Sequence, residues 1–257
     1  MNGTTPQTLV RLEGVGKTFS NGTTALEGLD LDVGQHEYLS LLGPTGCGKS
    51  TALRLMAGLG EPTAGRILWP GSPGTKARGE VGFVFQEPTL MPWATVLDNV
   101  HLPLKLAGKS RRSVEGELLE ALAMVGLSGF EKAYPRELSG GMRMRVSIAR
   151  ALVTRPRLLL MDEPFAALDE ITRLKLNNDL LDLWQKQSWT VVFVTHSVYE
   201  SVYLSSRIAV MAARPGRLTA DIPVDVPYPR TEAYRTSEDY NRHCRVASKA
   251  LHEAMGE

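Results

Sequence analysis

One stretch of the sequence decides the fold, Tyr38-Leu39-Ser40-Leu41-Leu42-Gly43-Pro44-Thr45-Gly46-Cys47-Gly48-Lys49-Ser50-Thr51. Its first five residues are typical of a buried strand, and residues 49–57 have a helical pattern. Glycine adopts backbone conformations closed to other residues, so the loop between them can wrap its N–H groups around an anion at the start of the helix. This strand–loop–helix order predicts a phosphate-binding loop.

Each loop residue type suits phosphate chemistry. Lys49 places a positive charge against the β- and γ-phosphates of a nucleotide, and Ser50 offers a hydroxyl to Mg²⁺. Two interpretations of Cys47 stay open: a thiol whose pKa is lowered by the helix N-terminus, or a small residue tolerated at a variable position. The predicted ATP-binding residues of the loop are Gly43, Pro44, Thr45, Gly46, Cys47, Gly48, Lys49, Ser50 and Thr51.

The strand patterns outside this stretch are of two kinds. Alternating residues at 9–15 and 29–33, with the Asn21-Gly22 turn signal between them, predict an antiparallel sheet. Apolar runs at 81–85, 158–161 and 191–194 alternate with helical patterns, which favours a parallel α/β sheet. Residues 87–136 change to helices and loops rich in Pro and Gly, and 236–255 has helical composition. The sequence therefore predicts an α/β core with an inserted helical lobe.

Two carboxylates, Asp162 and Glu163, follow the apolar run at 158–161. A parallel sheet binds ligands at the carboxyl ends of its strands, so they are expected on the same side as the phosphate loop. We expect Asp162 to help hold Mg²⁺ and Glu163 to orient or deprotonate an attacking water. The alternative is an acidic, solvated turn without catalytic work.

Composition excludes several classes of protein. The 257 residues carry 29 basic and 28 acidic side chains, a net charge of +1, so no overall field attracts nucleic acid. Two cysteines make no disulfide framework, which fits a reducing compartment. The first residues are not built like a signal peptide, and no apolar run approaches the roughly 18 residues of a membrane-spanning helix. We expect a cytoplasmic protein, with any membrane span supplied by another chain.

Five motifs carry a family resemblance. The phosphate loop is followed by Leu138-Ser139-Gly140-Gly141-Met142, Asp162-Glu163-Pro164, Ala167-Leu168-Asp169 and Thr195-His196. In this order they resemble the ATP-binding cassette (ABC) ATPases over residues 9 to about 217. The resemblance implies an α/β P-loop NTPase of ABC type, with a mixed sheet core, an antiparallel β-subdomain and an inserted helical subdomain. It implies one domain over 1–257: a RecA-like core (8–86 and 137–217), a helical subdomain (87–136) and a C-terminal helical segment (231–257).

The resemblance also implies roles for single residues. Phe19 matches the aromatic that stacks on adenine, and Asp169 matches a loop that communicates across a dimer. Ser139, Gly140 and Gly141 match the element that faces the γ-phosphate held by a second copy. The implied catalytic residues are Glu163, His196 and Gln86, and the implied Mg²⁺ ligands are Ser50, Gln86 and Asp162. Alternatives stay open: Phe19 as a core residue, His196 as an ordinary strand-end histidine, and Ser139 as a simple helix cap. Met142 and Met144 stand where the family often has glutamine.

Further stretches resemble one group of ABC ATPases, those of nitrate, sulfonate and taurine importers. They are Phe85-Gln86-Glu87-Pro88-Thr89-Leu90-Met91-Pro92-Trp93, residues 194–205 and Ala213-Arg214-Pro215-Gly216-Arg217. The resemblance implies an ATPase using ATP and Mg²⁺ at the cytoplasmic face of a membrane. Its partners would be a second copy, transmembrane permease subunits and, indirectly, a solute-binding protein, with no nucleic acid. The alternatives are a soluble cassette ATPase of DNA repair or translation, and a nucleotide-binding regulator that does not hydrolyse.

Overall fold

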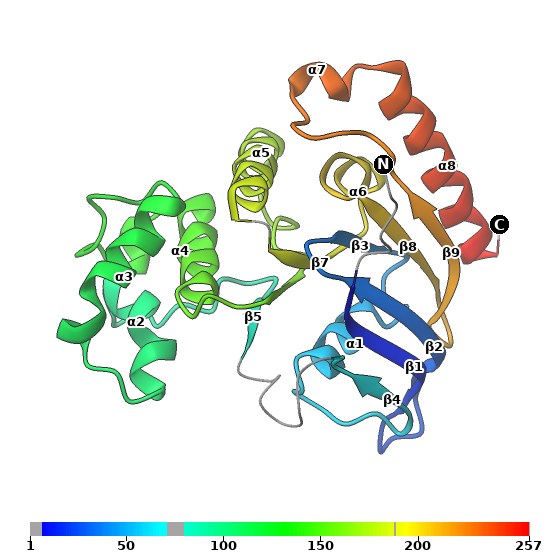
Figure 1. Cartoon of the computed structure of the whole chain (residues 1–257), viewed down its shortest axis with the longest axis horizontal. Helices are drawn as coiled ribbons and strands as arrows, with labels where there is room; N and C mark the ends of the chain where they lie inside the picture. The colour runs from blue at the N-terminus through cyan, green and yellow to red at the C-terminus, as the bar shows by residue number, and fades with distance from the viewer. Residues whose placement is uncertain (1–6, 71–79, 188, 257) are drawn as a thin grey trace. The chain divides into compact units, whose positions relative to one another are not determined.

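The computed structural model describes residues 7–70, 80–187 and 189–256, and its chain forms two compact units (Figure 1). Unit 1 combines Met1–Gly79 with Ser188–Glu257. Unit 2 is the intervening segment, Glu80–Gln187. The phosphate loop therefore belongs to unit 1, and the carboxylates Asp162 and Glu163 belong to unit 2.

The sheet of unit 1 that carries the phosphate loop is mixed. β3 (Tyr38–Leu42) lies between β7 (Thr190–Thr195) and β8 (Arg207–Ala212) and is parallel to both, and β9 (Arg217–Pro223) is antiparallel to β8. Every residue of β3 and β7 is buried, as expected for parallel strands covered on both faces. α1 (Lys49–Met56) follows β3, and α6 (Val198–Leu204) follows β7.

A second sheet of unit 1 is wholly antiparallel. β1 (Thr8–Thr18) lies between β2 (Thr24–Gly34) and β4 (Ala64–Leu68). The turn between β1 and β2 has Gly22 at φ 81°, and its N–H donates to the Phe19 carbonyl at 2.9 Å. The predicted strands and turn are confirmed, whereas β4, β8 and β9 had not been predicted.

The C-terminal helices α7 (Glu232–Arg235) and α8 (Glu238–Met255) complete unit 1, and α8 packs on β8, β9 and α6 (Figure 1). Arg230, which precedes α7, binds this part of the chain to α6. Its guanidinium is buried and donates to the carbonyls of Val202, Tyr203 and Ser205 at 3.0, 3.0 and 2.8 Å. A cation at the C-terminal end of α6 is favourable, because the helix carbonyls there carry partial negative charge. The C-terminal segment is thus attached to the helix that follows His196.

Unit 2 consists of two parallel strands and a group of helices. β5 (Val81–Val84) pairs with β6 (Leu158–Asp162). The helices are α2 (Val96–Leu106), α3 (Arg111–Met124), α4 (Gly140–Leu152) and α5 (Glu170–Gln187), with a 3-10 turn, η2, at Pro135–Glu137. α2, α3 and α4 pack on one another (Figure 1). Thr95, Ser110 and Ser139 begin these three helices, each accepting a backbone N–H bond, which explains where the helices start.

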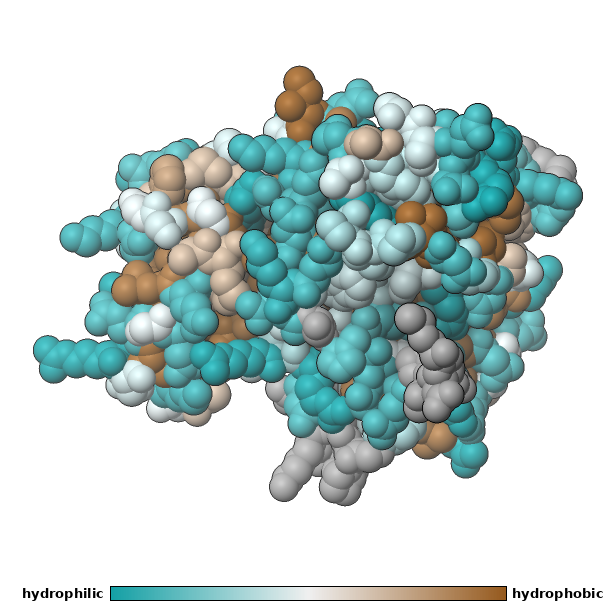
Figure 2. Space-filling model, turned by 45° about the horizontal axis from the view of Figure 1, so that its top comes forward, coloured by the Kyte–Doolittle hydropathy of each residue, from teal (hydrophilic) through white to brown (hydrophobic). Residues whose placement is uncertain are grey.

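The α/β fold with a mixed sheet and an antiparallel subdomain is confirmed, and the helical subdomain at 87–136 stays a prediction. The face seen in Figure 2 is mainly hydrophilic, with hydrophobic side chains in small separate groups. Within the described ranges, none of the helices is both long and apolar enough to cross a membrane.

Candidate active site

The phosphate loop leads into a helix whose start is open to an anion. α1 begins after Gly48, which has φ 92° and provides no side-chain cap. Five other helices begin with a hydroxyl that accepts a backbone N–H bond, from Thr95, Ser110, Ser139, Ser197 and Ser237. The first N–H groups of a helix have no partner within it, so those of α1 can bind an external negative group such as phosphate.

Lys49 is held inside this loop with 4% of its surface exposed. Its Nζ donates to the carbonyl oxygens of Gly43 at 2.7 Å and Pro44 at 3.0 Å. Packing requires glycine at Gly48, because a Cβ there would lie 2.6 Å from the carbonyl oxygen of Ala25. The loop therefore has a buried positive charge, and its shape is fixed by the contacts of Lys49 and by the packing at Gly48.

For Cys47, the structure contradicts the interpretation of a thiol whose pKa is lowered by the helix N-terminus. The side chain is fully buried, and burial raises the pKa of its thiol, against a smaller lowering effect of Lys49. A buried, protonated thiol is a poor nucleophile. Cys47 is thus a small packing residue of the loop, and the helix N-terminus does not make it reactive.

Alkylation of Cys47 is expected to be at least ~10-fold slower in the folded chain than in the unfolded chain near neutral pH, because both access and thiolate are lost. Iodoacetamide labelling followed by peptide mass spectrometry measures the rate. Cys244, buried in α8 with a raised pKa, is the internal comparison. Equal labelling of Cys47 in folded and unfolded chain would contradict the burial argument.

Phe19 is not a core residue. Its side chain is 45% exposed beside the β1–β2 turn, and the Nζ of Lys17 lies 5.7 Å from its ring centroid. An exposed aromatic face is what base stacking requires, at about 1–3 kcal/mol per base. The stacking role of Phe19 stays a prediction, but the alternative of a core phenylalanine is excluded.

His196 leaves the sheet beside the phosphate loop. Leu42 is paired with Thr195 in the parallel register of β3 and β7, so Gly43 and His196 emerge at the same sheet edge. The neighbours of His196 fix its turn: Thr195 Oγ1 accepts from the Ser197 N–H at 3.0 Å and donates to Glu200 Oε2 at 2.6 Å. Glu200 is buried and had not been singled out in the sequence, where its spacing of four from His196 was the available signal.

The carboxylates of unit 2 lie at the end of β6. Asp162 is buried at the last strand position, and Glu163 follows with φ 45°, a conformation that is costly for a residue other than glycine. Val84 is paired with Met161, so Gln86 and Glu163 leave the parallel pair at the same edge. Strained backbone persists where surrounding structure enforces it, often at active sites, and the turn at Glu163 is such a position.

The Ser139-Gly140-Gly141 element begins α4 and contacts α5. The Ser139 hydroxyl accepts from the Met142 N–H at 3.2 Å, so Ser139 does cap the helix, and this bond leaves its own proton unused. A Cβ at Gly141 would lie 2.7 Å from Thr172 Cγ2, so glycine here is also required by packing on α5. Asp169 accepts from the Thr172 N–H at 2.9 Å, a bond that lowers the pKa of Asp169. This element and Asp169 are neighbours within unit 2.

The predicted site residues thus form two groups. Unit 1 holds Phe19, the phosphate loop and His196, and unit 2 holds Gln86, Asp162, Glu163, Asp169 and the Ser139 element. Within unit 1, a helix that begins at Gly48 and carries a buried lysine directly after a buried strand is the arrangement of a P-loop nucleotide-binding protein. A model described as ABC transporter matches residues 26–166. The chain belongs to the ABC transporter family and is an ATPase of that family.

Known proteins are similar in sequence to this chain over most of its length. A putative ATP-binding protein of Brucella abortus is 50% identical over 219 residues, covering 85% of this chain and 84% of the relative. The aliphatic sulfonates import ATP-binding protein SsuB of Bacillus cereus is 43% identical over 234 residues, covering 90% and 91%. The solved ATP-binding cassette MJ0796, a dimer in a post-hydrolysis state bound to ADP and Pi, matches with TM-score 0.73 and 34% identity, covering 85% of this chain and 100% of that one.

Proposed function

We propose that the chain is the ATP-hydrolysing subunit of a membrane importer for a small solute of the nitrate, sulfonate or taurine type. Two copies would close over ATP, and hydrolysis would release them. The observation that carries this proposal is the start of α4, where an exposed Ser139 hydroxyl and a helix N-terminus form a second anion-binding element besides the phosphate loop. The sulfonate-importer relative and the dimeric cassette support the two parts of the proposal.

The donor set fits Mg²⁺. Magnesium is usually bound through one or two carboxylates plus substrate phosphates, rather than by a cage made of protein alone. Asp162 offers a buried carboxylate, and Ser50 and Gln86 offer neutral oxygens. Among the described residues, no group of three or more His, Cys, Asp or Glu side chains could hold a metal ion. When bound with ATP, Mg²⁺ would neutralise charge on the phosphates.

The residues of the chain divide the catalytic work. The loop N–H groups and Lys49 bind and orient the phosphates, and the face of Phe19 stacks on adenine. Glu163 orients the attacking water and accepts its proton, worth about 10²–10⁴ in rate for general-base help. His196, fixed by Thr195 and Ser197, contacts the γ-phosphate.

The second copy completes the site. Ser139 and the N–H groups at Gly140 and Gly141 would approach the γ-phosphate bound by the partner, where a helix N-terminus stabilises negative charge. Because Gly141 packs on Thr172, the same contact reaches the Asp169 turn. ATP thereby joins two subunits that separate after hydrolysis.

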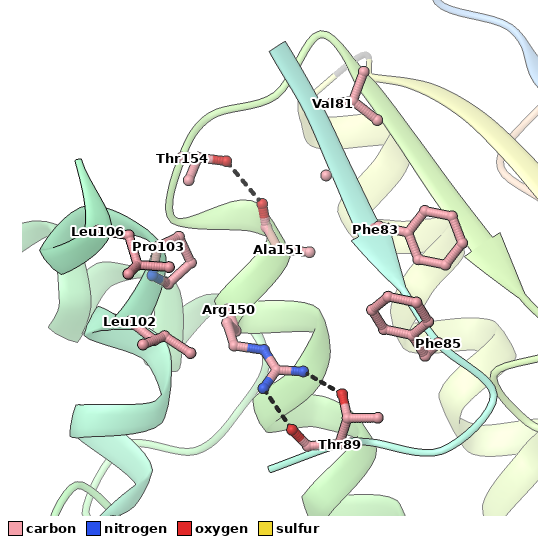
Figure 3. Close-up of a pocket in the computed structure, with 11 residues that line it drawn as sticks. Val81, Phe83, Phe85, Thr89, Leu102, Pro103, Leu106, Arg150, Ala151 and Thr154 are labelled. Atoms are coloured by element: carbon pink, nitrogen blue, oxygen red, sulfur yellow. Dashed lines mark hydrogen bonds between the residues drawn. The ribbon is translucent and has the colours of Figure 1, made fainter. Parts of the chain in front are cut away.

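A surface of unit 2 suits a permease subunit. A pocket of about 350 Å³ lies among β5, α2 and α4, with Phe83, Phe85, Leu102 and Leu106 among its lining residues (Figure 3). Leu106 is 80% exposed, and Trp93 before α2 is 77% exposed. Leu106 lines this pocket, and Trp93 lies two residues before Thr95, the cap of α2. Exposed apolar side chains of this kind mark interaction sites where they lie close together. We assign this surface to a short apolar helix of the permease and propose that the chain acts at the cytoplasmic face of the membrane.

Trp93→Ala is expected to weaken assembly with the permease by about 30-fold or more and to leave ATP binding unchanged, because hot-spot aromatics typically cost about 2 kcal/mol or more when truncated. Co-purification of the chain with a multispanning membrane protein measures assembly, and nucleotide titration measures binding. Trp93→Phe should restore part of the assembly, and Leu119→Ala, a 43% exposed position on α3, is the control. Equal loss of both functions in Trp93→Ala, or loss of neither, would count against this surface.

The importer assignment itself has a separate test. The chain reconstituted with its co-purified membrane partner should show ATP-dependent uptake of a sulfonate, taurine or nitrate into vesicles. Solute-independent ATPase activity with no uptake of any of the three would contradict the proposal that the solute is of the nitrate, sulfonate or taurine type. A partner that is a ribosome or DNA instead of a membrane protein would remove the importer proposal.

A further inference from the structure

We propose that Arg150 is a positioning residue: it ties the segment after Gln86 to helix α4, whose other end carries Ser139-Gly140-Gly141. Gln86 and the Ser139-Gly140-Gly141 element, which act at the metal and at the γ-phosphate in the proposed mechanism, would then move as one piece. This inference rests on the proposed role of Gln86 in hydrolysis.

The contacts of Arg150 are concentrated on two consecutive residues. Its Nη1 donates to the Thr89 carbonyl at 2.9 Å, and its Nη2 donates to the Pro88 carbonyl at 2.8 Å and to Thr89 Oγ1 at 2.9 Å (Figure 3). Pro88 lies two residues after Gln86. The guanidinium therefore fixes backbone next to the side chain that is predicted to reach the metal and water.

The segment held by Arg150 needs an external support. Residues 85–94 have neither helix nor strand, and Thr89 has φ 47°, which is unfavourable for a threonine. From the other side, Asn99 of α2 accepts from the Met91 N–H at 2.8 Å and donates to the Ala94 carbonyl at 3.2 Å. Asn99 thus supports the end of the segment near α2, and Arg150 supports the end near Gln86.

Helix α4 connects Arg150 rigidly to the Ser139-Gly140-Gly141 element. Arg150 is eleven residues after the cap Ser139, so the two ends lie about 16 Å apart at a rise of 1.5 Å per residue. Most residues of α4 between these ends are buried, and no proline interrupts it. A displacement of residues 88–89 is therefore transmitted along α4 to Ser139 and not absorbed by a flexible joint.

The type of side chain matters at this position. Arginine presents five N–H donors in a rigid planar fork, whereas lysine has a single flexible ammonium. Three acceptors on two residues match the fork. Arg150 is half-buried and lines the pocket of Figure 3 beside Leu102 and Pro103, so an occupant of that pocket would lie next to the tie.

The experiment compares Arg150→Met, Arg150→Lys and the control Arg155→Met in the purified full chain. Arg155 is five residues further along, 74% exposed and paired only at the surface with Glu120 at 3.3 Å. We expect Arg150→Met to lower kcat by ~10-fold or more with the KM for ATP within about twofold, because an interaction that acts on the transition state was removed. Arg150→Lys should recover part of kcat, and Arg155→Met should match wild type.

Gln86→Ala separates this inference from the function on which it rests. In a Gln86→Ala background, Arg150→Met should cost little more, since residues acting as one unit are not additive. Unchanged kcat in Gln86→Ala would contradict both the role of Gln86 in hydrolysis and the positioning role of Arg150. Reduced kcat in Gln86→Ala with wild-type kcat in both Arg150 variants would overturn the tie alone. So would a kcat loss in Arg150→Met that is fully explained by a smaller folded fraction, measured by thermal unfolding and nucleotide binding.

Discussion

Replacing Glu163 by glutamine is expected to lower kcat for ATP hydrolysis by about 10²–10⁴-fold, the usual contribution of a general base. The amide has the shape of the carboxylate, so the left-handed turn at φ 45° and the buried end of β6 should be retained. ATP binding should also remain, because the loop and Lys49 belong to unit 1. Steady-state phosphate release measures kcat, and nucleotide titration measures binding.

The same variant tests whether ATP joins two copies. With hydrolysis blocked, Glu163→Gln should become dimeric when ATP is added, as measured by size-exclusion chromatography with light scattering. Ser139→Ala in the Glu163→Gln background should remove that dimer. Glu120→Gln, at an exposed carboxylate of α3, is the control and should hydrolyse ATP like wild type. A kcat within threefold of wild type for Glu163→Gln would remove Glu163 from the role of base.

Strands buried on both faces were the part of the fold that the sequence predicted best. β3, β6 and β7 are continuous apolar runs because helices cover both sides of a parallel sheet. β4 was missed because no residue of Ala64–Leu68 is fully buried, and because its apolar and polar residues do not alternate. Its strand conformation comes from pairing with β1, a tertiary contact that a local pattern does not contain.

The candidate site shows the same division. The phosphate loop and its lysine were readable because strand, glycines and helix are contiguous. The support of His196 by Thr195 and Glu200, and of residues 88–89 by Arg150, was not readable, because it depends on which side chain reaches which backbone atom. At Gly141 the sequence indicated only part of the reason for glycine. The resemblance implied that this residue faces a γ-phosphate, and the structure adds that Thr172 of the same chain packs against it.

Lys49→Ala is expected to weaken ATP binding by at least ~10²-fold, since two hydrogen bonds to charged phosphates at about 1.5–3 kcal/mol each would be lost. The fold should survive, because the Gly43 and Pro44 carbonyls that Lys49 contacts lie in the loop between β3 and α1 and are not part of either element. Lys249→Ala removes a 79% exposed lysine of unit 1 and should bind ATP like wild type. Lys49→Arg should not restore binding, because a planar guanidinium does not reproduce the compact ammonium that donates to the Gly43 and Pro44 carbonyls. Fluorescent-nucleotide titration and thermal unfolding of all three variants decide the matter: near-wild-type affinity in Lys49→Ala would mean that the α1 N-terminus alone holds the phosphates.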